Sequence, residues 1–296
     1  MFFDSINLLY TILGDYDIIY DILMQMQPWS EKMIIDFHTH AFPDELAARA
    51  IDILSSQRNN IFTPVTDGRI SSLVGCMDDA GVDISVIMPV ITKPSQFIKL
   101  NLWAQSICSD RIISFGGVHH ATDDYKRDID FVVSLGLKGL KFHCEYQDFL
   151  VDESKMLRIY DYALSRGLIL LFHTGFDPGY SPPFRSSAGQ LANVADAMRG
   201  GVIIAAHLGG YGEWDHVAAH LADRDIYLDT SMGFQYYPGE EFLRIKEAFG
   251  AERLLFATDS PWSAAKKEIE ILSAMDIDES ARELILSGNA RGLLGI

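Results

Sequence analysis

Eight short apolar runs, separated by segments of helical character, constrain the fold of this chain more than any other feature. Most of the runs are rich in Val, Ile, Leu or Phe without strict alternation, which is typical of parallel strands buried on both faces. Their regular spacing predicts repeated β/α units. The predicted strands are residues 33–38, 84–90, 112–118, 138–143, 168–173, 202–207, 226–230 and 254–258.

Eight β/α units within about 260 residues predict an α/β fold of the (β/α)8 TIM barrel type. The alternative is an open doubly wound sheet, which binds ligands at one switch point and gives no reason for polar residues at most strand ends. The predicted helices follow the strands in turn, at residues 43–54, 68–80, 95–108, 123–135, 154–166, 188–198, 212–222, 239–249, 263–274 and 279–286.

Residues 1–32 form a separate extension ahead of a barrel domain that spans residues 33–296. Apolar residues recur in the extension at helical spacing, which predicts a helical structure. It lacks the basic start and the small-residue cleavage site of a signal peptide. Two alternatives stay open: an extension that packs on the domain, or a natural start of the protein at Met33.

Composition narrows the classes of partner. Lys and Arg number 24 against 41 Asp and Glu, so the net charge is −17. This balance argues against nucleic-acid binding and against a polybasic membrane contact, and no apolar run is long enough to span a bilayer. Three cysteines without a Cys-x-x-Cys motif disfavour a disulfide framework and favour a cytoplasmic location. We expect a small-molecule substrate, and a homo-oligomer stays open.

Metal-competent side chains stand at the ends of the predicted strands. His38 and His40 share one face of the first strand because side chains alternate along a strand. Imidazole is a common ligand of zinc. A barrel would gather all such residues around one pocket, because its active site forms at the carboxyl ends of the strands. The polar residues that end the later strands are Lys141, His143, His173, His207, Asp229 and Asp259.

Four motifs together resemble the amidohydrolase superfamily, in particular its amidohydrolase-2 branch, which includes aminocarboxymuconate-semialdehyde decarboxylase and related hydrolases. The similarity covers essentially residues 33–296, and the closing Gly-Asn-Ala also fits. The resemblance implies one divalent metal ion, with zinc expected and manganese or iron as alternatives. It implies His38, His40, His173 and Asp259 as the ligands. The motifs are Asp-Phe-His-Thr-His at 36–40, His-Thr-Gly at 173–175, His-Leu-Gly-Gly at 207–210 and Thr-Asp-Ser-Pro at 258–261.

The resemblance also implies two catalytic residues. Asp259 would handle the proton of the metal-bound water, and His207 would act beside the metal as a general acid/base or as an electrostatic stabiliser. A bound ion lowers the pKa of its water toward about 7, and a neighbouring carboxylate can accept a proton. We therefore expect a metal-dependent hydrolase that cuts a C–N or C–O bond of a small organic substrate by attack of metal-bound hydroxide. Asp36 and Asp229 are expected to support the ligands by hydrogen bonds.

Two other functions stay open. One is a nonoxidative decarboxylase or hydratase of a small carboxylic acid on the same scaffold, which needs a cation such as Lys141 or Arg185 to anchor the carboxylate. The other is a catalytically silent metal-binding scaffold. We also expect His143 and Trp262 to contact the substrate. For Lys141 and Arg185 a structural ion pair is the alternative, and for Trp262 it is packing.

Overall fold

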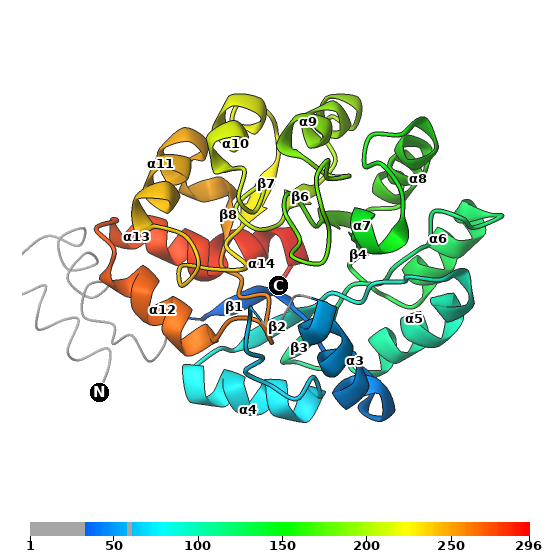
Figure 1. Ribbon diagram of the computed structural model, residues 1–296, viewed down its shortest axis with the longest axis horizontal. Helices are drawn as coiled ribbons and strands as arrows, with labels where there is room; N and C mark the ends of the chain where they lie inside the picture. The colour runs from blue at the N-terminus through cyan, green and yellow to red at the C-terminus, as the bar shows by residue number, and fades with distance from the viewer. Residues whose placement is uncertain (1–32, 58–60) are drawn as a thin grey trace, which may run out of the picture. The chain divides into compact units, whose positions relative to one another are not determined.

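The computed structural model describes residues 33–57 and 61–296, so the predicted helical extension at residues 1–32 lies outside the described part. The chain from Ile34 to Ile296 forms one compact unit. Its parallel strands alternate with helices along the chain, as Figure 1 shows. The strands are β1 (Ile35–Thr39), β2 (Ile84–Ile87), β3 (Ile112–Ser114), β4 (Gly139–Phe142), β5 (Ile169–Phe172), β6 (Ile203–Ala205), β7 (Tyr227–Asp229) and β8 (Leu254–Leu255).

The eight strands close into a barrel. Continuous ladders join β1 through β3 in one sheet and β4 through β8 in another. A parallel bridge between Gly116 and Leu140 joins the chain after β3 to β4, and one between Thr39 and Ser260 joins β1 to the chain after β8. Both gaps between the sheets are therefore paired. The predicted barrel is confirmed, and the open doubly wound sheet is wrong.

Helices surround the strands, close to the predicted ranges. A short turn of helix, α7, follows β4 where none was predicted, and a π-helical segment interrupts the predicted helix 279–286. The helices are α3 (Asp44–Gln57), α4 (Ile70–Ala80), η2 (Pro94–Gln96), α5 (Phe97–Ser106), α6 (Tyr125–Ser134), α7 (Cys144–Gln147), α8 (Ser154–Ser165), α9 (Ala188–Ala197), α10 (Trp214–Leu221), α11 (Gly239–Phe249), η3 (Ala251–Arg253), α12 (Ala265–Ala274), α13 (Glu279–Glu283), η4 (Leu284–Gly288) and α14 (Asn289–Leu294).

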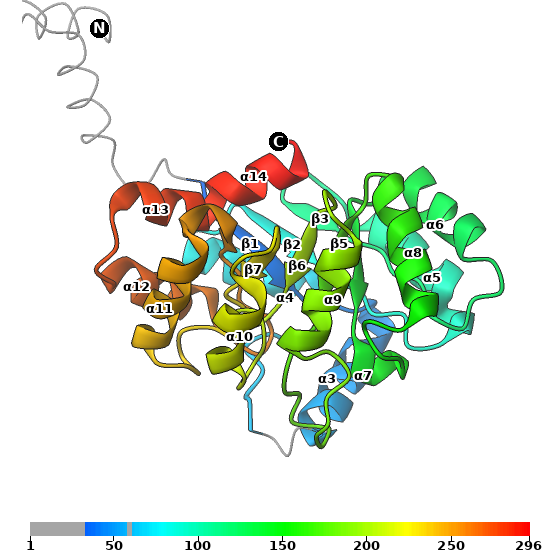
Figure 2. The same ribbon diagram turned by 90° about the horizontal axis from the view of Figure 1, so that it is seen from above.

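The strands are buried on both faces, which explains why their sequences do not alternate. In β5, Leu170 and Phe172 belong to the large apolar cluster that contains most of the buried residues of the outer helices. Ile169 and Leu171 belong to a second cluster with residues of the other strands and Leu294 of α14. Figure 2 shows α14 at one end of the barrel and α3 and α7 toward the other. Apolar side chains thus fill the α14 end and leave the carboxyl ends of the strands for polar residues.

Candidate metal centre and active site

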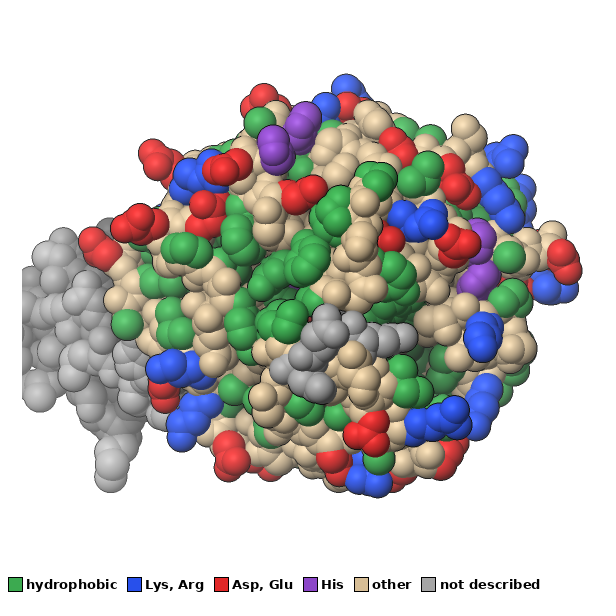
Figure 3. Space-filling model, viewed as in Figure 1, with side chains coloured by type: hydrophobic (Ala, Val, Ile, Leu, Met, Phe, Trp, Pro, Cys, Tyr) green, Lys and Arg blue, Asp and Glu red, His purple; other side chains and the backbone are tan. Residues whose placement is uncertain are grey.

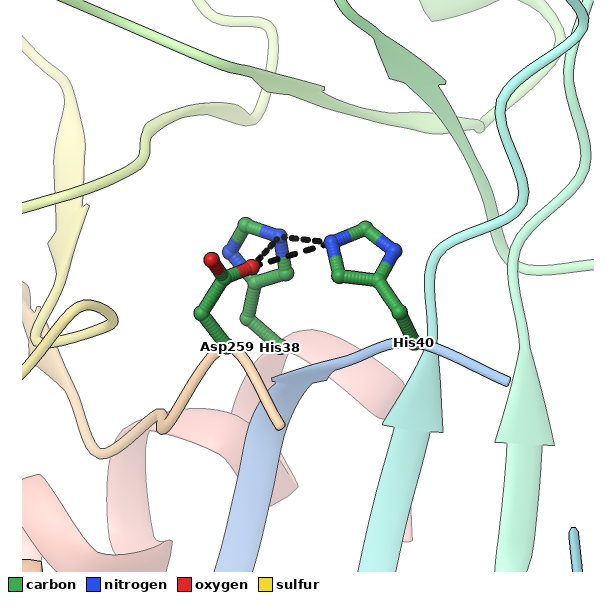
Figure 4. Close-up of side chains that lie close together, drawn as sticks. All are labelled: His38, His40 and Asp259. Carbon is green, nitrogen blue, oxygen red and sulfur yellow. Dashed lines mark hydrogen bonds and ion pairs between the residues drawn. The ribbon is translucent and has the colours of Figure 1, made fainter. Parts of the chain in front are cut away.

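Three predicted ligands converge where β1 and β8 end (Figure 4). The Nε2 atoms of His38 and His40 lie 3.2 Å apart. Oδ1 of Asp259 lies 2.9 Å from Nε2 of His40 and 3.4 Å from Nε2 of His38. Ligands of a tetrahedral zinc ion at about 2.0–2.1 Å are separated by roughly 3.3 Å. The three donor atoms are therefore spaced as the ligands of one divalent ion would be.

The far nitrogen of each histidine is held by an oxygen atom. Nδ1 of His38 lies 2.9 Å from Oδ2 of Asp229, and Nδ1 of His40 lies 3.0 Å from the carbonyl oxygen of Met88. A carbonyl only accepts, so Nδ1 of His40 donates and its Nε2 lone pair faces the shared point. Burial lowers the pKa of His40 to about 4, which keeps the ring neutral, as a ligand must be. The donor set fits a metal ion.

Two carboxylates of the site stay ionised despite their burial. Burial alone would raise the pKa of Asp259, but its close contacts with the His40 and His38 rings hold it well below its usual range. Burial would likewise raise the pKa of Asp229. The electrostatic interaction and the hydrogen bond with His38 lower it instead, to about 2. One carboxylate therefore faces the shared point and the other orients a ligand ring from behind.

Lys141 adds a positive charge to this group. Its Nζ lies 3.0 Å from Nε2 of His38, and the side chain is 1% exposed. The ammonium group therefore stands beside the proposed metal ligands and lines the same cavity. This position suits contact with a substrate oxygen.

His173 lies in a different group from the one expected. It groups with His143 and Asp177, and the ligand atoms of these three buried residues lie within 4.8 Å of one another. The His143 and His173 rings stack with centroids 4.0 Å apart, and Nε2 of His143 lies 3.3 Å from Oδ2 of Asp177. His173 as a fourth ligand of the first group stays a prediction.

His207 connects the two groups. Its Nε2 lies 2.9 Å from Nδ1 of His173, and its Nδ1 lies 2.9 Å from Oγ of Ser231. Its backbone N–H donates to Oδ1 of Asp229 at 3.0 Å. Burial lowers the pKa of His207 to about 3, so the ring is neutral near pH 7. Its placement beside the first group, with both nitrogens held, suits a positioned proton donor or acceptor.

The backbone at the site is strained. His207 and Asp259 have φ angles of 60° and 62°, in the left-handed region that non-glycine residues rarely adopt. Such residues cost on the order of 1–3 kcal/mol each and cluster at functional sites, where the surrounding structure holds them in place. Both side chains line the cavity at the barrel mouth.

Gly175, two residues after His173, allows a close approach of two loops. Its φ is 84°, and an added Cβ would lie 2.4 Å from the backbone nitrogen of Tyr211. We expect Gly175→Ala to lower the free energy of unfolding by about 3 kcal/mol or more, because crowding adds to the left-handed penalty. Gly81→Ala is the control, since Gly81 has φ of 72° with open space around it. Urea denaturation measures both, and equal losses would refute the crowding.

The other predicted side chains divide into two sets. Lys141, His143 and Trp262 line the cavity at the barrel mouth. Arg185 lies outside its lining and pairs instead with Oδ1 of Asp148 at 2.6 Å and Oε2 of Glu145 at 3.5 Å. This arrangement favours the ion-pair alternative for Arg185.

Asp36 supports the ligand strand through the backbone. Its Oδ2 accepts a hydrogen bond from Oγ1 of Thr258 at 2.6 Å, and its Oδ1 accepts one from the Thr258 backbone at 3.0 Å. Oδ1 also lies 3.4 Å from the backbone nitrogen of His38. Burial raises the pKa of Asp36 to about 7. The expected hydrogen bond between Asp36 and a ligand side chain is thus replaced. Its carboxylate instead joins β1 to the segment that carries Asp259 through hydrogen bonds with Thr258.

Sequence analysis missed two polar residues of the site. Asp177 lies in the loop after β5, four residues beyond His173, and Ser231 lies two residues beyond Asp229. The alternation along β7 placed Ser231 on the same side as Asp229, and this pattern was the available signal. No pattern pointed to Asp177, because a loop residue carries no periodicity.

A cavity of about 440 Å³ opens at the carboxyl ends of the strands. Hydrophobic side chains gather around the centre of the face shown in Figure 3, which is the face of the barrel mouth. Six polar residues of the cavity belong to the site just described: His40, Lys141, His143, His173, His207 and Asp259. The lining also includes the polar residues Thr92, Ser95, Gln96 and Lys99.

Comparison with known proteins fits this geometry. A family model described as amidohydrolase matches residues 35–296. The chain belongs to the amidohydrolase family. No curated protein matches it. In the part of this amidohydrolase that the structure describes, no helix has the length and apolar character needed to cross a membrane.

Several solved structures share the fold. An uncharacterized TIM-barrel protein, Bb4693 from Bordetella bronchiseptica, is 20% identical with a TM-score of 0.73, over 89% of this chain and 98% of that one. A 5-carboxyvanillate decarboxylase from Novosphingobium aromaticivorans with bound manganese is 14% identical with a TM-score of 0.67, over 90% and 98%. A probable 2-pyrone-4,6-dicarboxylic acid hydrolase from Acinetobacter baumannii is 14% identical with a TM-score of 0.60, over 89% and 99%.

Proposed function

We propose that this amidohydrolase is a metal-dependent hydrolase that cuts a C–N or C–O bond of a small organic molecule. The observation that carries the proposal is the convergence of Asp259, His38 and His40, whose ligand atoms lie 2.9–3.4 Å apart. One divalent ion held there, zinc or manganese, would supply Lewis acidity and activate a water molecule. Manganese is bound in one of the similar structures.

The chain's own residues would divide the remaining work. The ionised carboxylate of Asp259 would accept a proton from the attacking water. Neutral His207, held by Ser231 through its ring and by Asp229 through its backbone N–H, would hold or deliver a proton at the leaving atom. Lys141 would stabilise negative charge that develops on the substrate oxygen, because its ammonium group is buried beside His38.

Nonoxidative decarboxylation of a small carboxylic acid is the second candidate. The placement of Lys141 in the cavity favours it, because a buried ammonium group can anchor a carboxylate. A decarboxylase of a substituted benzoate with the same fold also supports it. In a hydrolase the same cation would only stabilise negative charge on a substrate oxygen. Lys141 therefore suits both reactions, and identification of the product separates them.

Metal analysis and a substrate panel test both proposals. We expect the purified protein to carry about one divalent ion per chain, as a three- or four-ligand site would. We also expect turnover of an amide, ester or lactone that stops on chelation and returns with zinc or manganese. Release of CO₂ from an aromatic or unsaturated acid would favour the decarboxylase instead. Metal-free protein with unchanged activity would refute both.

A further inference from the structure

The cavity has an apolar wall that the proposed chemistry does not use. Beyond the polar floor, two helices and the segment after β2 line it mostly with aliphatic and aromatic side chains, and Thr92, Ser95 and Gln96 add uncharged polar groups. Its volume of about 440 Å³ lies in the range of roughly 300–1,000 Å³ typical of pockets for drug-sized ligands. The apolar lining residues include Leu46, Ala50, Ile53, Pro89, Leu100 and Trp103.

Helix α3 carries two apolar stripes, and only one of them packs on the protein. Ala47 and Ile51 are buried, with exposures of 0% and 8%. Leu46, Ala50 and Ile53 follow each other at intervals of four and three residues and so share another face. Leu46 and Ile53 are 41% and 45% exposed. A solvated helix face is usually polar, so this second stripe points to a ligand that covers it.

The outer part of the cavity offers a ligand little charge. The lysine at its rim, Lys99, is 68% exposed and its Nζ lies 3.1 Å from Oε1 of Glu45, which neutralises it. The other charged groups that line the cavity in the described part of the chain, Lys141 and Asp259, belong to the floor. A charged group bound along the α3 wall would lose its hydration without gaining a partner.

We propose that the substrate carries an uncharged apolar tail that lies along the Leu46–Ala50–Ile53 face of α3, while its reacting group sits at the polar floor. The inference rests on the proposed function for the place of the reacting group. The cavity runs without a break from His40 and Lys141 to this face, so one molecule can fill both parts. A ligand confined to the floor would leave the apolar wall in water.

A series of straight-chain carboxylates tests the tail. Acetate, butanoate, hexanoate and octanoate are titrated into the full-length protein by calorimetry. We expect the dissociation constant to fall by about fourfold for each methylene that the wall buries. Ala50→Phe should flatten this dependence while acetate binds as before, because the added ring fills the space beside α3. Ala48→Phe is the matched control, since Ala48 is exposed on the same helix and lies outside the lining.

Leu46→Gln, at an exposed position, provides a second test that does not depend on added bulk. It should weaken octanoate binding several-fold and leave acetate binding unchanged. A chain-length dependence that is absent in the wild type, or that survives equally in Ala50→Phe and Ala48→Phe, overturns the inference. Turnover is measured separately. A steep chain-length dependence without metal-dependent turnover supports the apolar tail and contradicts the proposed function. Metal-dependent turnover with a flat chain-length dependence supports the proposed function and contradicts the tail.

Discussion

Asp259→Asn should lower kcat/KM by at least about 1,000-fold, within the range that loss of a general base produces. The carboxylate is the one anionic member of the converging group, with Oδ1 2.9 Å from Nε2 of His40. The amide keeps the shape but removes the charge and the proton acceptor. Metal content should fall as well, because the site then offers two neutral nitrogens and a weak oxygen donor.

Asp229→Asn provides the graded comparison. Asp229 holds the far nitrogen of His38 and does not face the shared point. Loss of such a supporting partner typically costs about 10–100-fold in metal affinity or activity. Steady-state kinetics and elemental analysis on the same preparations measure both variants. Equal effects of the two substitutions, or full activity in Asp259→Asn, would contradict the assignment of Asp259.

Much of this architecture could be predicted because parallel strands leave a strong mark on a sequence. A strand buried on both faces needs a continuous apolar run, as in Ile169–Phe172, and the next residue emerges at the barrel mouth. The polar residues at the strand ends therefore identified the candidate site as well as the fold. Strand lengths were overestimated, since β8 ends at Leu255 although the apolar run continues to residue 257. Beyond that point the chain stays buried but leaves the regular ladder.

The grouping of the histidines could not be predicted from spacing. His207 and Asp259 turn toward the barrel mouth through left-handed backbone, a choice that depends on the whole surrounding structure. The stacking of His173 on His143 likewise depends on ring orientations that no periodicity encodes. A pattern can show that a residue ends a strand, but it does not specify which neighbour its side chain will meet.

The apolar wall of the cavity could not be predicted from the sequence either. Residues 43–54 were predicted as a helix, and both of its apolar stripes contribute to that prediction. The sequence does not distinguish a stripe that packs on the barrel, such as Ala47 and Ile51, from one that faces a cavity. The distinction appears only when exposure is known residue by residue.

His207→Asn should leave the bound metal in place and reduce turnover by about 100- to 10,000-fold, the usual contribution of a positioned acid or base. Asparagine is close in size to imidazole and can still donate a hydrogen bond, but it cannot exchange a proton at neutral pH. His207 lies outside the group of His38, His40 and Asp259, so the donor atoms of that group stay unchanged.

Ser231→Ala separates the proton role of His207 from its orientation. It removes the oxygen that lies 2.9 Å from Nδ1 of His207 and leaves the ring itself in place. The ring would then be held only through its contact with Nδ1 of His173, and activity should fall by less than in His207→Asn. Elemental analysis and urea denaturation accompany the kinetics of both variants. If His207→Asn loses metal and stability together, His207 is itself a ligand, and the centre extends from β1 across the barrel to β6.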